Sequence, residues 1–317
     1  MTSTSTGRVA VAEAPAKAII TGEHFVVHGS TALAAAIDRH VRVEVREAPS
    51  RGISVRSDRV SASHPASLLP VKKVVGSLCS AYSIEPSHEL NISSTIPRGS
   101  GLGSSASTMV AAAAAMAKLH AVRLGLPELV RFAMEGERLV HGNPSGIDAN
   151  ACAYGGLILF RVGDAPRRVD LESPRRLLTV YSGVQRSTRM MISKVSSSRE
   201  RHPRLFARMV DSVSQMSAGA AESLVRGDMH ALGKLLTLNQ GLLASVGASN
   251  PLLDDLVETL LSFGCLGAKL TGAGGGGSVV AVTPEGEGKS IISQLSERGF
   301  EGFETVLPLR GVESWLE

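Results

Sequence analysis

The chain has 317 residues, a formal net charge of +4, 43% hydrophobic residues and only 3% aromatic residues. This balance is typical of an ordinary folded protein and excludes a disordered or fibrous one. The length exceeds the roughly 100 to 200 residues of a single domain, so we expect two domains that share a cleft. Because aromatic side chains for stacking bases are scarce, the modest positive charge favours small anionic ligands over nucleic acid.

The sequence lacks the apolar patterns of targeting and membrane-spanning segments. Residues 1 to 17 contain no apolar run behind a basic start, and nowhere do about 18 apolar residues follow each other. The three cysteines, Cys79, Cys152 and Cys265, are far apart and form no CxxC pair, which argues against disulfides and against structural zinc. We expect a cytoplasmic protein with no membrane partner and with reduced, buried thiols.

The first half of the chain predicts β-structure followed by helices. Residues 8 to 46 alternate short apolar runs with turn residues, which is typical of strands. The segment from Leu90 to Ile96 alternates at period two, and a glycine-rich loop and an alanine-rich helix, TMVAAAAAMAKLHAV, follow it. Pro127 then opens a second helix that ends at Gly142, since proline is favoured in the first turn and glycine after the last.

The second half alternates helices and short strands. NPSGIDANACAYGG, residues 143 to 156, is interpreted as a loop that leads into the strand LILFRV. The pattern then changes to a strand, LLTVYSG, and to helices around residues 203 to 227, 229 to 245 and 252 to 263. A second glycine-rich turn, the strand SVVAVT, a helix and the strand ETVLPL close the chain.

We place a domain boundary near residue 175, where the pattern changes. The expected units are an N-terminal domain over residues 1–175 and a C-terminal domain over residues 176–317. No internal repeat or low-complexity tract accompanies this change, apart from the glycine and alanine runs.

The loop PRGSGLGSSAS, residues 97 to 107, is interpreted as an anion-binding site. Its glycines permit positive φ angles and close approach of the backbone to a ligand, and its serines supply hydroxyl groups at the helix start. Unpaired N–H groups and the helix dipole favour phosphate there, and a serine hydroxyl suits Mg²⁺. An ordinary capped helix is the alternative that the loop alone leaves open. The candidate phosphate-binding residues are Pro97, Gly99, Ser100, Gly101, Leu102, Gly103, Ser104, Ser105 and Ala106.

Two other nucleotide-binding patterns find no support. Gly101, Gly103 and Ala106 satisfy the dinucleotide pattern GxGxxG/A after a predicted strand. That fold requires a second strand that ends in an acidic residue about 20 positions later, whereas here the helix runs into LGLPELV and another helix. The pattern GxxxxGK[ST] of Walker-type ATPases is absent from the sequence.

A second glycine-rich segment, KLTGAGGGGS at residues 269 to 278, has five glycines in six positions. Ordering so much glycine costs on the order of a kcal/mol of backbone entropy at each position. A floppy turn is the alternative interpretation, but two phosphate-friendly loops in one chain favour a shared site.

Three charged residues are candidates for the chemistry. Glu137 lies on a partly apolar face of the second predicted helix, although most helical glutamates are solvated. Asp148 stands between Ile147 and Ala149 on the predicted loop, an apolar setting in which a carboxylate requires a partner. Lys17, at the start of a strand, is the natural partner, and an exposed lysine at a strand edge is the alternative.

Two further features favour structural interpretations. His24 and His28 form the pattern HFVVH, but the segment is β-like and lacks the glutamate of HExxH, which argues against zinc. The basic residues between 186 and 208 are best explained as a solvated helix face, with nucleic-acid binding as the alternative.

Four segments together resemble the GHMP kinase superfamily and, within it, the short-form mevalonate kinases. They are APAKAIITGEHFVVHG at 14 to 29, PRGSGLGSSAS at 97 to 107, GERLVHGNPSGIDANACAYGG at 136 to 156 and KLTGAGGGGS at 269 to 278. GLGSSA marks the superfamily broadly, whereas GEHxVVxG and GERxxHGNPSGxD are far more specific. The resemblance implies a two-domain α+β GHMP kinase fold, in which the N-terminal domain is like the second domain of ribosomal protein S5 and the C-terminal domain is ferredoxin-like.

The resemblance also implies roles for the candidate residues at the centre of the site. Asp148 would be the base that faces the substrate hydroxyl, with Lys17 paired to it. Glu137 and Ser105 would hold Mg²⁺ between the β- and γ-phosphates of ATP, and Ser104 and the loop amides would hold the phosphates.

Other matches imply the substrate side. Glu23 and His24 match the substrate-side part of the first motif, Thr188 matches a family threonine near mevalonate, and Gly274 would border the site from the second domain. The implied activity is phosphorylation of the C5 hydroxyl of mevalonate by ATP in isoprenoid biosynthesis. ATP, mevalonate and Mg²⁺ are thus the expected ligands, and a homodimer is compatible with the resemblance.

Two positions depart from the family pattern. Ala16 stands where many relatives have glycine, and Ser278 replaces a frequent cysteine, but neither removes a proposed catalytic group. Kinases of homoserine, galactose, phosphomevalonate or the tertiary hydroxyl of mevalonate share the loops without the combination of the two specific motifs. A non-catalytic ligand sensor is the remaining alternative, which the presence of Lys17, Glu137 and Asp148 disfavours.

Overall fold

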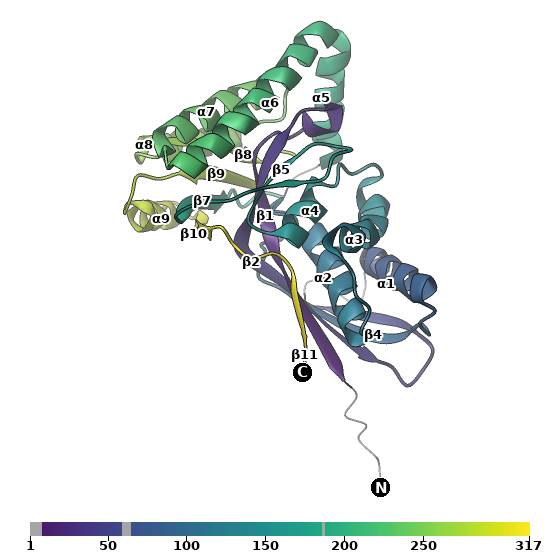
Figure 1. Ribbon diagram of the computed structural model, residues 1–317. Helices are drawn as coiled ribbons and strands as arrows, with labels where there is room; N and C mark the ends of the chain where they lie inside the picture. The colour runs from purple at the N-terminus through teal and green to yellow at the C-terminus, as the bar shows by residue number, and fades with distance from the viewer. Residues whose placement is uncertain (1–7, 59–64, 186–187) are drawn as a thin grey trace.

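The computed structural model describes residues 8–58, 65–185 and 188–317. Within these residues the strands form a seven-stranded and a four-stranded sheet (Figure 1). The larger sheet contains β1 (Val9–Thr21), β2 (Ala32–Glu47), β3 (Gly52–Ser57), β4 (Ser87–Ser94), β5 (Leu157–Phe160), β6 (Arg167–Val169) and β11 (Glu313–Leu316). The smaller sheet contains β7 (Arg175–Tyr181), β8 (Gly267–Thr271), β9 (Ser278–Val282) and β10 (Glu301–Leu307).

The helices gather over the two sheets in chain order. Near the larger sheet lie α1 (Leu69–Tyr82), α2 (Ser104–Leu119), α3 (Leu126–His141) and α4 (Ile147–Tyr154). The later helices are α5 (Thr188–Arg201), α6 (Pro203–Arg226), α7 (Met229–Ser245), α8 (Pro251–Ser262) and α9 (Gly288–Glu297). The helices α6, α7 and α8 lie together at the end of the molecule that holds the smaller sheet (Figure 1). The expected mixed α and β architecture is therefore confirmed.

Helix α2 is the centre of the larger core. Its alanine run and Met109 are buried on all sides, because α2 packs against β1 and β2 on one side and against α1 and α3 on the other. A helix that is apolar all round is expected to be buried in this way, and small side chains allow its axis to approach the sheet closely. The start of α2, where the glycine loop ends, is thereby held firmly against β1.

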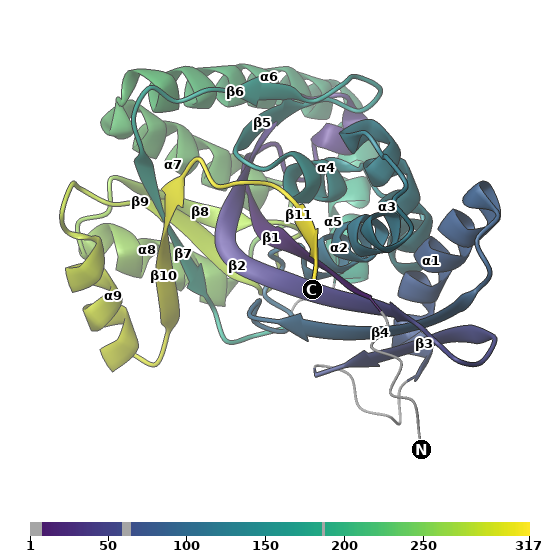
Figure 2. The same ribbon diagram turned by 60° about the horizontal axis from the view of Figure 1, so that its bottom comes forward.

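The larger sheet contains strands from both halves of the described chain. Strand β7, the first strand of the smaller sheet, begins at Arg175, while β11 returns to the larger sheet and pairs with β1. The first and last strands of the described chain, β1 and β11, are therefore neighbours in one sheet, as Figure 2 shows. The division of the chain near residue 175 stays a prediction.

Most predicted elements are present, but one interpretation is wrong. The predicted helices of the second half correspond to α6, α7 and α8. The segment 143 to 156, predicted to be a loop, instead contains the helix α4, which begins after Gly146 in the left-handed conformation at φ 90°. Nearly all of α4 is buried, so the segment shows no alternation of apolar and polar residues from which a helix could be predicted. Asp148 therefore stands in the first turn of a helix.

None of the helices within the described residues combines the length and the apolar character that crossing a membrane requires.

A pair of imidazoles fixes the end of α2 that lies opposite the glycine loop. The Nε2 atoms of His88 in β4 and His120 after α2 lie 2.7 Å apart, a contact in which at least one ring must be neutral. Burial lowers the pKa of both rings, and the charge of His120 lowers the pKa of His88 further. Protonation of both rings would break this contact.

The contribution of this pair to the stability of the fold should therefore decrease as the pH falls below about 6.5, the pKa of an unfolded histidine. Below that pH the unfolded chain binds more protons at these two positions than the folded chain does, which favours unfolding. Unfolding by urea, measured between about pH 7.5 and about pH 5.5, tests this expectation. The variant His120→Gln should show a shallower dependence on pH, and an unchanged dependence would contradict the assignment to this pair.

Candidate active site

The glycine loop has the geometry of an anion-binding site. Gly99, Gly101 and Gly103 have φ angles of 71°, 79° and 81°, and α2 begins directly after Gly103. The first N–H groups of a helix have no carbonyl partner within that helix, and the dipole places partial positive charge at the same end. The start of α2 is therefore suited to bind phosphate oxygens, and Ser104 is exposed there.

Both sheets hold this loop in place. The backbone N–H of Lys17 in β1 donates to the carbonyl of Leu102 at 2.9 Å. The hydroxyl of Ser278 in β9 donates to the carbonyl of Ser100 at 3.0 Å. Ser278, a departure from the family pattern, therefore anchors the loop to the second sheet. The conformation of the loop depends on contacts from both halves of the chain.

An ion pair joins Lys17 to Asp148. The Lys17 Nζ lies 2.9 Å from Asp148 Oδ1, with 1% of the lysine side chain and 30% of the aspartate side chain exposed. A Cβ atom on Gly103 would lie 2.8 Å from Lys17 Cγ, so only glycine leaves room for the lysine against the loop. The structure thus brings together the two residues predicted to be partners, beside the loop predicted to bind phosphate.

Glu137 in α3 contacts the start of α2. The hydroxyl of Ser105 donates a hydrogen bond to the Glu137 carboxylate, of which little is exposed to solvent. Burial raises the pKa of Glu137 to about 7; the Ser105 hydrogen bond opposes this effect, the charge of Asp148 adds to it and that of Lys17 opposes it. A carboxylate so placed favours a bound cation, because a cation would compensate its charge.

These groups surround one cavity. A hollow of about 550 Å³ is lined by Lys17, Asp148 and Glu137 and also by Gly272 and Ala273 of the second glycine-rich segment. The second glycine-rich segment therefore contributes to the wall of this cavity, and its last residue, Ser278, bonds the first glycine loop at Ser100. A ligand site shared by the two segments stays a prediction. A cavity of this size accommodates a small molecule.

The comparisons with known proteins agree with this geometry. Residues 70–156 match the GHMP kinases N terminal domain, and residues 220–301 match the GHMP kinases C terminal region. The mevalonate kinase of Aeropyrum pernix is 38% identical over 93% of this chain and 95% of that protein. The chain belongs to the GHMP kinase family and, within it, to the mevalonate kinases. The resemblance inferred from the sequence motifs is confirmed.

Further relatives support the same assignment. The mevalonate kinase of Methanothermobacter thermautotrophicus is 36% identical over 86% of this chain and 90% of that protein. The crystal structure of L. major mevalonate kinase in complex with R-mevalonate superimposes with a TM-score of 0.81 and 28% identity, covering 97% of this chain and 98% of that one. The two-domain GHMP kinase fold extends over nearly the whole chain.

The remaining predicted residues of this GHMP kinase are His24, Gly274 and Thr188. His24 lines the cavity, and its Nε2 lies 2.9 Å from the carbonyl oxygen of Ala273, whereas Gly274 is not among the lining residues. Gly274 has a φ of 72° and packs so closely against Ala248 that an added Cβ would lie 2.0 Å from the carbonyl oxygen. Thr188 is the first residue of α5, and its side chain lies outside the described residues.

Glu23 is buried, unlike a substrate ligand whose side chain faces the solvent. It lies in the turn after β1, in the wall of the cavity, with its side chain fully buried. The ammonium group of Lys269 in β8, also fully buried, forms an ion pair with Glu23 and donates to the carbonyl of Leu270 at 2.6 Å. The role of Glu23 in substrate binding stays a prediction.

Sequence reasoning missed Lys269 as part of this site. The only local signal was a lysine in an otherwise uncharged segment that ends in the second glycine-rich turn. Arg199 in α5 was considered only as part of a basic helix face, yet it also lines the cavity and donates to His28 Nδ1 at 3.3 Å. Both residues reach the site through tertiary contacts, which the local sequence pattern does not reveal.

The close approach of Gly103 to Lys17 leads to a prediction for the variant Gly103→Ala. The new methyl group would displace the Lys17 side chain and strain a backbone with positive φ, so kcat/KM should fall by about tenfold or more. Steady-state kinetics of ATP consumption measures this effect.

Gly163→Ala is the matched control for this variant. Gly163 has a φ of 94°, but an added Cβ would meet no atom within 4 Å. This control should lose about 1 to 2 kcal/mol of stability from backbone strain and keep its kcat/KM. Equal activity of the two variants would show that the contact with Lys17 is unimportant.

Proposed function

We propose that this protein transfers the γ-phosphoryl group of ATP to the C5 hydroxyl of mevalonate and so forms 5-phosphomevalonate. The observation that carries the proposal is the Lys17–Asp148 pair, 2.9 Å apart in the wall of a cavity that adjoins the phosphate-binding loop. The relatives named mevalonate kinase, together with the solved structure of one with R-mevalonate, support this choice of substrate.

In this mechanism Asp148 acts as the general base. Its carboxylate accepts the proton of the substrate hydroxyl while the oxygen attacks the γ-phosphorus of ATP. The Lys17 ammonium holds the carboxylate in position and stabilises the negative charge that develops on the attacking oxygen. Since phosphoryl transfer requires little covalent chemistry from the protein, most of the catalysis comes from this alignment.

The glycine loop and α2 supply the other half of the site. Backbone N–H groups after Gly101 and Gly103, together with the hydroxyl of Ser104, are suited to hold the phosphates of ATP. The positive end of the α2 dipole reduces the repulsion between the phosphates and the attacking oxygen.

Mg²⁺ fits the residues beside this loop. The buried Glu137 carboxylate, whose pKa is raised, and the Ser105 hydroxyl bound to it are both oxygen donors at the edge of the phosphate site. Within the described residues no group of three or more histidine, cysteine or acidic side chains forms a metal site. Kinases commonly hold Mg²⁺ through one or two carboxylates plus substrate phosphates, so the smaller donor set suffices. When bound, the ion would neutralise charge on the phosphates.

A coupled assay of ATP consumption tests the proposal directly. Mevalonate should be phosphorylated far more efficiently than phosphomevalonate, homoserine or galactose, because the relatives described above are mevalonate kinases. The absence of turnover with mevalonate would reject this substrate and leave the family assignment intact.

The variant Asp148→Asn tests the assignment of the base. It should lower kcat by about 10² to 10⁴ because the amide cannot accept the proton, while the affinity for ATP should be retained. Steady-state kinetics and calorimetric titration with ATP measure the two quantities. Near-normal turnover in this variant would show that Asp148 is not the base.

The variant Glu137→Gln tests the proposed metal ligand. The Mg²⁺ concentration required for half-maximal activity at fixed ATP should rise by about tenfold, since the amide is a weaker ligand than a carboxylate. The control is Glu135→Gln on the same helix, whose side chain is 32% exposed and pairs with Arg138. A similar Mg²⁺ requirement in both variants would argue against Glu137 as a ligand.

A further inference from the structure

The buried ion pair between Lys269 and Glu23 has no role in the mechanism described above. Both side chains are fully buried, and Glu23 lies in the wall of the same cavity as Lys17 and Asp148. Lys269 holds one carboxylate oxygen of Glu23, while the other, Oε2, has no hydrogen-bond partner among the described residues. An acidic group with an unsatisfied oxygen therefore lies close to the catalytic pair.

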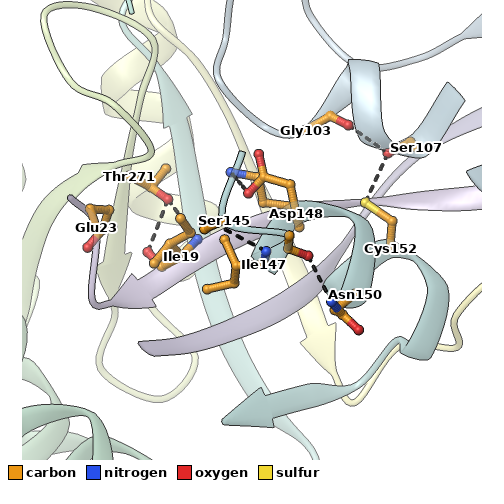
Figure 3. Close-up of polar contacts among 12 residues, drawn as sticks. Ile19, Glu23, Gly103, Ser107, Ser145, Ile147, Asp148, Asn150, Cys152 and Thr271 are labelled. Carbon is orange, nitrogen blue, oxygen red and sulfur yellow. Dashed lines mark hydrogen bonds and ion pairs between the residues drawn. The ribbon is translucent and has the colours of Figure 1, made fainter. Parts of the chain in front are cut away.

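Stability alone is a weak explanation for this pair. Burying two charges costs more in lost hydration than their attraction commonly returns. The strands β8 and β1 are already joined by Thr271, whose hydroxyl accepts from the Ile19 N–H at 2.8 Å and donates to the Ile19 carbonyl at 3.0 Å (Figure 3). The docking of β8 against β1 thus has uncharged contacts of its own.

Lys17 interacts electrostatically with both members of the pair. Burial raises the pKa of Glu23 and lowers the pKa of Lys269, and the attraction between the two groups opposes both effects. The positive charge of Lys17 makes a smaller contribution that lowers both pKa values. Glu23 is therefore a second carboxylate within the field of Lys17, whose ammonium binds Asp148. Because Lys269 compensates the charge of Glu23, the Lys17 ammonium remains paired with Asp148.

On the basis of the function proposed above, we propose that Lys269 is a positioning residue that binds Glu23 and thereby keeps the Lys17 ammonium on Asp148 and the reacting groups. Without Lys269, the Glu23 carboxylate would stay buried in the wall of the cavity that Lys17 also lines, with the Lys17 ammonium as a cation whose charge acts on it. The lysine would then be drawn from Asp148, and the alignment of base, hydroxyl and phosphate would be lost.

The variant Lys269→Met tests this role. It should lower kcat by about tenfold to a hundredfold, since small misplacements of catalytic groups have effects of that size. The KM for ATP should change little, because the glycine loop and α2 are untouched. This separation of kcat from KM for ATP is not expected from a general loosening of the fold.

The double variant Lys269→Met/Glu23→Gln provides the decisive comparison. It removes both charges, leaves no carboxylate to compete for Lys17, and should recover most of the kcat lost in Lys269→Met. If Lys269→Met does not fold, Glu23→Gln supplies the single change, since it is nearly isosteric and leaves the Lys269 charge uncompensated near Lys17. That variant should also be slow and should also be rescued in the double variant.

Thr271→Val is the matched structural control. It breaks the hydrogen bonds to Ile19 between β8 and β1 and leaves the charges in place. It should lower the melting temperature and keep kcat at temperatures where it is folded. A kcat loss in Thr271→Val equal to that in Lys269→Met would overturn the inference in favour of a structural role.

A folded double variant as slow as the single one would also overturn the inference, because Glu23 would then act on the substrate itself. Failure of the wild-type protein to phosphorylate mevalonate would instead reject the proposed function. The two failures are therefore distinguishable.

Discussion

The active site depends on the placement of one buried ammonium group. Lys17 is almost fully enclosed, and it is held by its own backbone hydrogen bond to the glycine loop, by the close approach of Gly103 and by the ion pair with Asp148. A lysine so deeply buried loses most of its hydration and must be compensated by a carboxylate. The strand β1, the loop before α2 and the first turn of α4 therefore meet at this point.

The charges around Lys17 explain why the site is assembled from both halves of the chain. Three carboxylates, Glu23, Glu137 and Asp148, and two ammonium groups, Lys17 and Lys269, lie in or beside the cavity wall. Four of these residues are nearly or fully buried, so each is sensitive to the charge of its neighbours. Glu137 is the carboxylate without an ammonium partner in this set, which is consistent with a role towards a metal ion.

The contacts between the two sheets bring the second glycine-rich segment against the first glycine loop and against His24. Ser278 anchors the first glycine loop from β9, and Ala273 in the second glycine-rich segment contacts His24. Gly274 is required where the chain passes the Ala248 carbonyl. Since these contacts come from separate sheets, a small change in their relative position would alter the distance between the base and the phosphates. That sensitivity is expected for a reaction that depends on alignment.

The sequence by itself indicated the local chemistry: the glycine loop and the family motifs follow from residue types and spacing. The residues alone left the pairing of Lys17 with Asp148 open, and the resemblance to the GHMP kinases implied it. Asp148 was nevertheless assigned to a loop, because α4 is buried on nearly all sides and lacks the periodicity that marks a surface helix. Only the tertiary structure revealed Lys269, which lies 246 positions from Glu23 along the chain. A local sequence pattern reflects the backbone preferences and the burial of the residues within one helix or strand. The partner of a buried charge is instead determined by how whole sheets pack against each other.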